Sequence, residues 1–475
     1  MQALAQKIKP YVNRTKELAE VRERLELVRR GGLLFEAVLE WYGVPGIGKT
    51  TLGQMIGKLC SEIDVPFARL DFRPEENSRA LFYADEPLLL LEDIVNALRI
   101  HEPLEFRKKL ARYYEAKEEY LRQERHKRVV GAFLGDVDKL LAKGPLVLLF
   151  DTTDQAMPEI TTWLEENVLS PLCLTGKCLI IWTGRFPQRW KRFEVRRRVV
   201  SEKLGPLTPE DTEEQVGPEG TRIYALTRGH PLGNEEVAEV VWRYKAEGRA
   251  APDLELINVL VDRVIDRYVM KGIEDDLKAA FRVLVVVRQF DVTILRQLLS
   301  NFLKEFKGLR EPLFLSILGR LKGTYLVEWD PVRKGYAIDP TIRRILALQL
   351  CYNHPKRYLQ INDMAADIYA ERIKKVQENR SVYVVERLYH RAVPSIIKKR
   401  PLGPMIKELR EELEKYLAAY YVDEDRERAQ RSTDQLFQEL SRDEELREII
   451  GDEGFKTLTK AVEHHLRELE NDDLS

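Results

Sequence analysis

The sequence contains few cysteines and carries almost no net charge. Its four cysteines are spaced neither as a metal site nor as a disulfide framework, so we expect ordinary buried or surface thiols in a reducing cytosol. These residues are Cys60, Cys173, Cys178 and Cys351. The 77 basic and 78 acidic side chains give a formal net charge of −1, which argues against a protein that binds polyanions over its whole surface.

The sequence also lacks a segment that would direct it to a membrane. Its N-terminus has no apolar signal-peptide core, and no apolar run approaches the ~20 residues that a membrane-spanning helix needs. We therefore expect a cytoplasmic protein without a membrane partner. At 475 residues the chain is long enough for about three domains.

A complete phosphate-binding loop is the clearest feature that the sequence does contain. The segment GVPGIGKT at 43–50 fits the pattern G-x-x-x-x-G-K-[ST] at every fixed position. Glycines let the backbone N–H groups of such a loop converge on phosphate oxygens, and the following helix adds its positive N-terminal end. An apolar strand at 33–42 and an amphipathic helix at 51–60 supply the required order of strand, loop and helix.

The loop therefore predicts a site for ATP or ADP with Mg²⁺. Lys49 would reach the β- and γ-phosphates, and the hydroxyl of Thr50 would bind Mg²⁺. The loop residues that we expect to contact the nucleotide are Gly43, Pro45, Gly46, Ile47, Gly48, Lys49, Thr50 and Thr51.

Two further apolar runs predict buried parallel strands. The run GPLVLLFD ends at Asp151, which such a strand would deliver to the ligand edge of the sheet, and Asp151 would hold Mg²⁺ partly through water. The run KCLIIWTGR ends at Arg185. Between them, Asp154 is a candidate to orient the attacking water, or equally a helix N-cap.

These motifs, in this order, resemble the STAND class of signalling ATPases, which includes the NB-ARC and NACHT proteins. The segment VNRTKEL at 12–18 resembles their adenine-covering entry, TGR at 183–185 their Thr-x-Arg sensor, and GHPL at 229–232 their Gly-x-Pro-Leu element. The resemblance implies that Val12, Asn13 and Arg14 lie on the adenine side, that Pro231 packs against the adenine, and that Arg185 contacts the γ-phosphate.

The resemblance also has consequences for catalysis. As in NACHT proteins, a second acid, Asp154, follows Asp151 by three positions, so Lys49, Asp151, Asp154 and Arg185 form the expected catalytic set of a slow ATPase. Related proteins place a His that contacts the β-phosphate of ADP where this chain has Asp339. A carboxylate does not favour a phosphate, which argues against a resting state held by that contact.

The expected fold is an α/β P-loop NTPase domain, with a parallel sheet flanked by helices, followed by an α-helical domain, a winged helix and a C-terminal α-helical region. Helices at 276–290, 291–303 and 312–321 with a hairpin at 324–339 predict the winged helix. The expected boundaries are 1–30 for the adenine-covering segment and its helix, 31–204 for the nucleotide domain with a helical insertion at about 87–142, 205–273 for the small helical domain, 274–354 for the winged helix, and 355–475 for a TPR-like, sensor or docking region.

The predicted function is a switch in which nucleotide exchange releases the winged helix and drives homo-oligomerisation or partner recruitment. The segment before Tyr11 is too short for an effector domain, so we expect a separate effector or trigger protein, or an output in the C-terminal helices. An alternative is a DNA-binding AAA+-like ATPase, similar to archaeal initiators, that uses the basic run at 189–198 with Arg333 and Lys334. For that run, however, we favour a solvated helix and loop, because charge runs usually form solvated surface. A third possibility is a protein that holds nucleotide without turnover.

Overall fold

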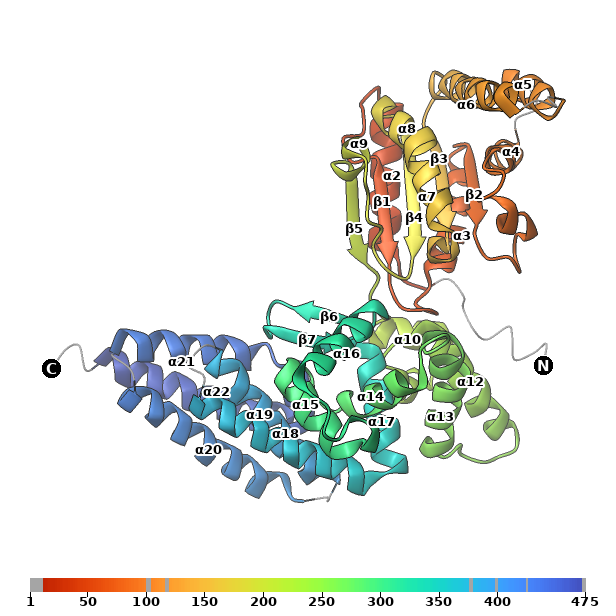
Figure 1. The fold of residues 1–475 in the computed structure, drawn as a ribbon. Helices are drawn as coiled ribbons and strands as arrows, with labels where there is room; N and C mark the ends of the chain where they lie inside the picture. Colours follow the sequence, from red (N-terminus) through yellow and green to blue (C-terminus); the bar gives the residue numbers. More distant parts are fainter. Residues whose placement is uncertain are drawn as a thin grey trace. The chain divides into compact units, whose positions relative to one another are not determined.

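The computed structural model describes residues 12–99, 104–115, 119–375, 379–397, 400–423 and 426–471. The chain divides into two compact units, Met1–Ala250 and Ala251–Ser475. The first contains a parallel sheet flanked by helices and the second is largely helical, so the predicted fold class is confirmed (Figure 1). The finer division into five segments stays a prediction.

A parallel sheet of five strands forms the centre of the first unit, in the order β2-β3-β4-β1-β5. The strands are β1 (Val38–Tyr42), β2 (Phe67–Asp71), β3 (Leu146–Asp151), β4 (Cys178–Gly184) and β5 (Val199–Lys203). Every residue of β3 and β4 is buried, as expected for strands that are covered on both faces. Because all paired strands are parallel, their carboxyl ends share one edge of the sheet.

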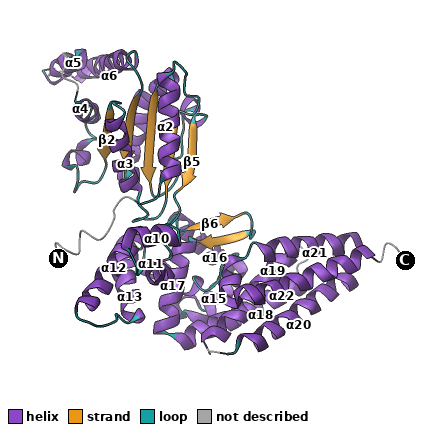
Figure 2. Ribbon diagram, turned by 180° about the vertical axis from the view of Figure 1, so that it is seen from behind, coloured by secondary structure: helices purple, strands orange, loops and turns teal. Residues whose placement is uncertain are grey.

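Helices cover both faces of this sheet. Helices α7 (Pro158–Leu164) and α8 (Ser170–Thr175) lie over one face in Figure 1, and α2 (Thr15–Arg29) and α3 (Lys49–Glu62) lie over the other in Figure 2. Helix α2 begins at Thr15, because Asn13 and Arg14 before it have positive φ angles of 60° and 68°.

The remaining helices of the first unit lie in its insertion, in the connections between its strands and after its sheet. The insertion predicted at 87–142 contains three helices, α4 (Leu88–Ala97), α5 (Glu105–Tyr114) and α6 (Glu119–Leu141). Short helices are η1 (Ser78–Phe82), η2 (Thr153–Gln155), η3 (Glu165–Leu169) and α9 (Phe193–Arg196). After the sheet come α10 (Pro209–Val216), α11 (Gly220–Thr227) and α12 (Pro231–Ala246). Thr208 caps α10 in a capping box with Asp211.

The second unit contains the predicted three helices and hairpin. They are α14 (Asp275–Leu284), α15 (Val292–Phe302), α16 (Glu311–Gly323), β6 (Val327–Asp330) and β7 (Gly335–Ile338), and β6 and β7 pair antiparallel. The other elements are α13 (Asp253–Leu260), η4 (Val261–Val269), η5 (Lys304–Phe306), α17 (Pro340–Asn353), α18 (Pro355–Lys375), α19 (Arg380–Ile397), α20 (Leu402–Asp423), α21 (Arg426–Ser441) and α22 (Glu444–Asn471). In the described parts of the chain, no helix is long and apolar enough to cross a membrane.

A buried cluster of charges fastens the hairpin to the C-terminal helices of this unit. Arg288 contacts Asp443 at 2.7 Å and Glu386 at 3.1 Å, and these three side chains are 1%, 3% and 1% exposed. Arg333 of the hairpin turn reaches the same Glu386 at 2.6 Å. Charges at this depth are stable only when paired, so the cluster fixes these elements relative to one another.

Candidate nucleotide site

The phosphate-binding loop joins the buried strand β1 to helix α3. Gly46 and Gly48 have φ angles of +81° and +97°, which glycine adopts without the strain that a Cβ causes. Gly48 is the N-cap of α3, and among the described residues no side chain caps this helix end. The first turn of α3 also contains no acidic residue. The positive end of the helix is therefore uncompensated by the chain itself, as in a site for an anion.

The carbonyl groups in the middle of the loop are hydrogen-bonded by residues from outside it. The Pro45 carbonyl lies 2.9 Å from Nε2 of His230. The Gly46 carbonyl accepts from the backbone N–H of Leu232 at 3.3 Å. The Ile47 carbonyl accepts from Nη2 of Arg14 at 2.8 Å. The start of α12 and the segment before α2 therefore both hold the outer side of the loop.

The side chain of Lys49 folds back against the start of the loop. Its ammonium group donates to the carbonyls of Gly43 at 2.7 Å and Val44 at 3.1 Å. Desolvation lowers the pKa of Lys49 to about 8, against the opposing influence of Asp154 and Asp151. Nucleotide phosphates would supply the negative charge that this desolvated cation lacks.

The predicted catalytic acids and the sensor come together at the carboxyl edge of the sheet. Strand β4 lies between β1 and β3, so Arg185, which follows β4, is placed between the loop and Asp151. The charges of Asp151, Asp154 and Arg185 all influence the pKa of Lys49, which places them around one site.

Asp151 is buried and both of its oxygens are occupied. Oδ1 accepts from the hydroxyl of Thr183 at 2.7 Å, and Oδ2 accepts from Nη2 of Arg69 at 2.7 Å. Arg69 is thus an unpredicted neighbour of the expected metal ligand.

Asp154 is paired with Arg185, the predicted sensor residue. Its Oδ2 lies 3.0 Å from Nε of Arg185, and its Oδ1 accepts from the backbone N–H of Arg185 at 3.1 Å. Asp154 lies inside η2, whose N-cap is Thr152, so it does not cap that helix. In this arrangement Asp154 positions Arg185.

Of the three predicted adenine-side residues, Arg14 contacts the loop. Val12 is buried, and Arg14 bridges the carbonyls of Ile47 and Gly205 at 2.8 and 3.0 Å. Asn13 donates to Asp211 of α10 at 2.5 Å. Pro231 begins α12, and its own contact with an adenine stays a prediction.

The side chains present fit Mg²⁺ only together with phosphates. In the described ranges no group of at least three His, Cys, Asp or Glu could hold a metal ion. In nucleotide sites, however, Mg²⁺ is bound by one or two carboxylates, substrate phosphates and water. Asp151 and Thr50 form a donor set of that kind. Bound Mg²⁺ would neutralise phosphate charge there.

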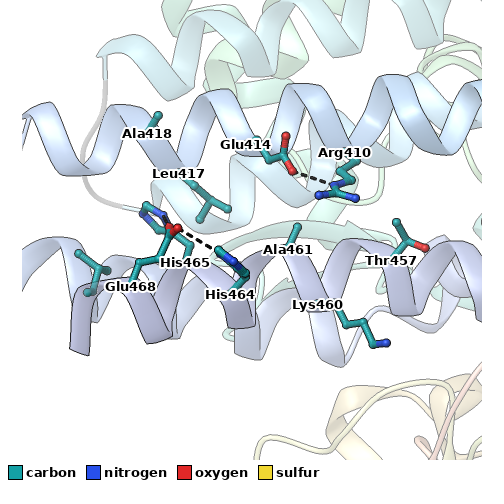
Figure 3. A pocket seen from close by; sticks show the side chains of 11 residues that line it. Arg410, Glu414, Leu417, Ala418, Thr457, Lys460, Ala461, His464, His465 and Glu468 are labelled. Atoms are coloured by element: carbon teal, nitrogen blue, oxygen red, sulfur yellow. Dashed lines mark hydrogen bonds and ion pairs between the residues drawn. The ribbon is translucent and has the colours of Figure 1, made fainter. Parts of the chain in front are cut away.

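The second unit contains Asp339 and a cavity between two of its helices. Asp339, where related proteins place a His, accepts from the N–H groups of Thr341 and Ile342 and so caps α17. A cavity of about 1050 Å³ lies between α20 and α22 (Figure 3). In Figure 3 Arg410 donates a hydrogen bond to Glu414 of its own helix, at 2.7 Å. The described residues include no group of at least three His, Cys, Asp or Glu that could hold a metal ion here.

Sequence reasoning missed three residues that the structure places at the site. His230 is the variable residue of the Gly-x-Pro-Leu element, and its position immediately before a proline at the start of a helix was its only signal. Arg69 and Asp71 alternate with apolar residues in β2, so the period of two could have placed them on one face.

Comparisons with known proteins give a resemblance to solved structures alone. The chain matches no protein-family model and no curated protein. RuvB of Thermotoga maritima, described as a Holliday junction branch migration motor, is 12% identical, over 69% of this chain and 92% of that chain, with a TM-score of 0.33. A variant of the same RuvB gives 13% identity, the same coverage and a TM-score of 0.32. At these values the resemblance carries no weight for activity, and the P-loop NTPase fold rests on the loop and sheet themselves.

Proposed function

We propose that this protein is a nucleotide switch of the STAND type, which binds ATP or ADP with Mg²⁺ at the loop 43–51. The observation that carries the proposal is the set of three hydrogen bonds from His230, Leu232 and Arg14 to successive loop carbonyls. Through them the loop that would hold phosphate also contacts α12 and the N-terminal segment.

The energetic basis is a shift of population between two conformations. A nucleotide changes the balance only through a difference in its affinity for the two conformations. ATP and ADP differ by the γ-phosphate, so the groups that distinguish them would be those nearest to it. Lys49 and Arg185 have that role in the proposal.

Hydrolysis in this switch is slow. Asp154, the candidate for orienting water, has a side chain that is only 6% exposed and is bonded to Arg185 through both of its oxygens. It would orient a water molecule only after giving up part of this pairing. We expect Asp154→Asn to change the position of Arg185 as well as the rate, so that ATP affinity and hydrolysis fall together.

The nucleotide site is tested by Lys49→Ala. Removing the ammonium leaves the phosphates without their cation, so the variant should bind labelled ATP or ADP at least ~10-fold more weakly, the loss of a charge-assisted hydrogen bond. Lys127→Ala, an exposed lysine on α6, is the matched control and should bind as the unmodified chain does. Equal affinity of the Lys49 variant and the unmodified chain would rule out the site.

Nucleotide-dependent assembly is the finer part of the proposal. The third helix of the predicted winged helix, α16, exposes Leu313 and Leu315 at 48% and 57%, which suits contact with another protein better than contact with phosphates. We expect a homo-oligomer, or a complex with an effector, with a non-hydrolysable ATP analogue but not with ADP. Light scattering after size exclusion measures this, and identical masses in both nucleotides would contradict the switch.

DNA binding is the second candidate, because one feature favours it. Arg189, Lys191, Arg192, Arg196 and Arg197 are all exposed around the short helix α9. The predicted wing contact Arg333, in contrast, is engaged with Glu386, and Arg320 of α16 pairs with Glu274 and Asp276. A gel shift on duplex DNA at several salt concentrations decides between the candidates, since phosphate contacts make affinity fall steeply with salt.

A further inference from the structure

The end of β2 places a positive charge against the predicted metal ligand. Asp71 of β2 and Asp151 of β3 are register partners, so the strands bring two carboxylates side by side. Arg69 lies two residues before Asp71, on the same face of the strand. Its Nη2 is 2.7 Å from Oδ2 of Asp151 and 3.0 Å from Oδ2 of Asp71. The guanidinium therefore bridges both acids.

Within the described residues, Arg69 is the cation that forms an ion pair with Asp151. Asp71 has a second partner, because Arg73 donates to it from Nε at 3.0 Å and from its backbone N–H at 3.0 Å. Burial acts to raise the pKa of Asp71, but the hydrogen bonds and charge of Arg73, together with the charge of Arg69, outweigh it and the pKa is lowered. Arg73 thus gives Asp71 a second cationic partner, whereas among the ion pairs of the described residues Asp151 is paired with Arg69.

This arrangement bears on how a metal ion could reach Asp151. A divalent cation that approaches the carboxylate meets a charge that Arg69 has already compensated, and is repelled by the guanidinium itself. Nucleotide phosphates would add several negative charges to the same place. They would attract both cations and reduce the repulsion between them.

The position of Arg69 also allows its guanidinium to move away from Asp151. Asp71 is already within 3.0 Å, so the guanidinium keeps an ion-pair partner when it leaves Asp151. Its Nε is buried with no hydrogen-bond partner among the described residues, so little is lost at that atom when the group turns.

We propose that Arg69 is an internal counter-ion that keeps Mg²⁺ away from Asp151 until a nucleotide is bound. The metal then enters with the phosphates and not before them. The inference rests on the proposed function, because it assumes that Asp151 serves a nucleotide-bound metal.

Removing the charge of Arg69 in the nucleotide-free, full-length protein tests the proposal. Mn²⁺ is the probe for the Mg²⁺ position, and the electron paramagnetic resonance signal of free Mn²⁺ reports binding. Arg69→Met keeps most of the length of the side chain and should bind Mn²⁺ at least ~10-fold more tightly than the unmodified chain, as expected when a repelling charge a few ångströms away is removed. No gain in affinity would overturn the proposal.

Arg73→Met is the matched control. It removes the same charge from the same strand end but leaves the contact with Asp151 intact, so its Mn²⁺ affinity should stay within about threefold of the unmodified chain, the size of a screened surface effect. An equal gain in both variants would also overturn the proposal, because the general field would then act instead of the contact.

A second variant covers the case in which Arg69→Met does not fold. In Asp71→Asn the guanidinium loses its alternative partner and pairs more firmly with Asp151, so Mn²⁺ binding should weaken; stronger or unchanged binding would contradict the proposal. Labelled ADP binding by the unmodified chain is measured separately. If the chain binds no nucleotide, the proposed function fails, while the Mn²⁺ comparison still decides the role of Arg69.

Discussion

His230 offers the most direct test of whether the loop and α12 are coupled. The residue is fully buried, its Nδ1 accepts from the N–H of Gly233 at 3.1 Å, and its Nε2 lies 2.9 Å from the Pro45 carbonyl. An acceptor at Nδ1 and a carbonyl at Nε2 are both satisfied by the neutral ring with its proton on Nε2. One imidazole thus caps α12 and holds the loop.

Two substitutions separate these roles. Asn is a good N-cap, so His230→Asn can keep the bond to Gly233, but its shorter side chain does not reach Pro45. The lost hydrogen bond and the partly vacated ring volume should cost ~1–2 kcal/mol. His230→Ala also loses the cap, which adds ~1 kcal/mol. In urea denaturation we therefore expect the unmodified chain to be the most stable, His230→Asn to be less stable and His230→Ala to be the least stable.

The decisive measurements are the hydrogen exchange of the loop and the affinity for nucleotide. Without His230 the loop samples more conformations before it binds, so His230→Asn should raise hydrogen exchange at residues 43–49 and weaken nucleotide binding ~5-fold, the equivalent of about 1 kcal/mol. His126→Asn, on a half-buried histidine of α6, should change neither. If His230→Asn lowers stability but leaves loop exchange and affinity unchanged, His230 is only a helix cap and the coupling argument is wrong.

Three further expectations concern glycine, buried charge and pH. Gly46→Ala forces a Cβ to 2.6 Å from the imidazole at a φ of +81° and should abolish nucleotide binding, whereas Gly131→Ala, with open space around it, should raise the melting temperature slightly. Asp443→Asn removes one of the two carboxylates that pair with the buried guanidinium of Arg288 and should cost ~3–5 kcal/mol in denaturation, against under ~0.5 kcal/mol for Glu427→Gln in an exposed pair. Burial and two nearby arginines hold the pKa of His390 well below its usual value, so the unfolded chain takes up a proton that the folded unit does not. Stability of the second unit should therefore fall as pH drops below ~6.5, by up to ~1.4 kcal/mol per pH unit, and a flat urea midpoint between about pH 7.5 and 5.5 would contradict this.

The sequence predicted the parts of the site that depend on local pattern. The uninterrupted apolar runs before Asp151 and Arg185 identify strands buried on both faces, because only such strands exclude polar residues along their whole length. The glycines and Lys49 identify the loop because phosphate binding leaves few other choices. Both strands and the loop come from short segments that carry their own signal.

The contacts that the sequence did not reveal join distant segments. His230 and Pro45 are 185 residues apart, and Arg69 and Asp151 are 82 apart, so no spacing rule links them. Asp154 was open to two interpretations because a carboxylate after a strand can orient water or cap a helix; its partner, Arg185, follows a different strand. Such pairings depend on strand order, which local periodicity does not determine.

The geometry of the peptide group gives the strongest reason to expect a switch. Each peptide of the loop is planar, so its N–H and its carbonyl point in opposite directions and turn together. A rotation that improves the contact of an N–H with a phosphate must also move the carbonyl that His230, Leu232 or Arg14 holds. The phosphate side and the outer side of the loop therefore cannot be optimised independently. A bound nucleotide would therefore change the energy of the contacts with α12 and with the N-terminal segment directly through the loop peptides.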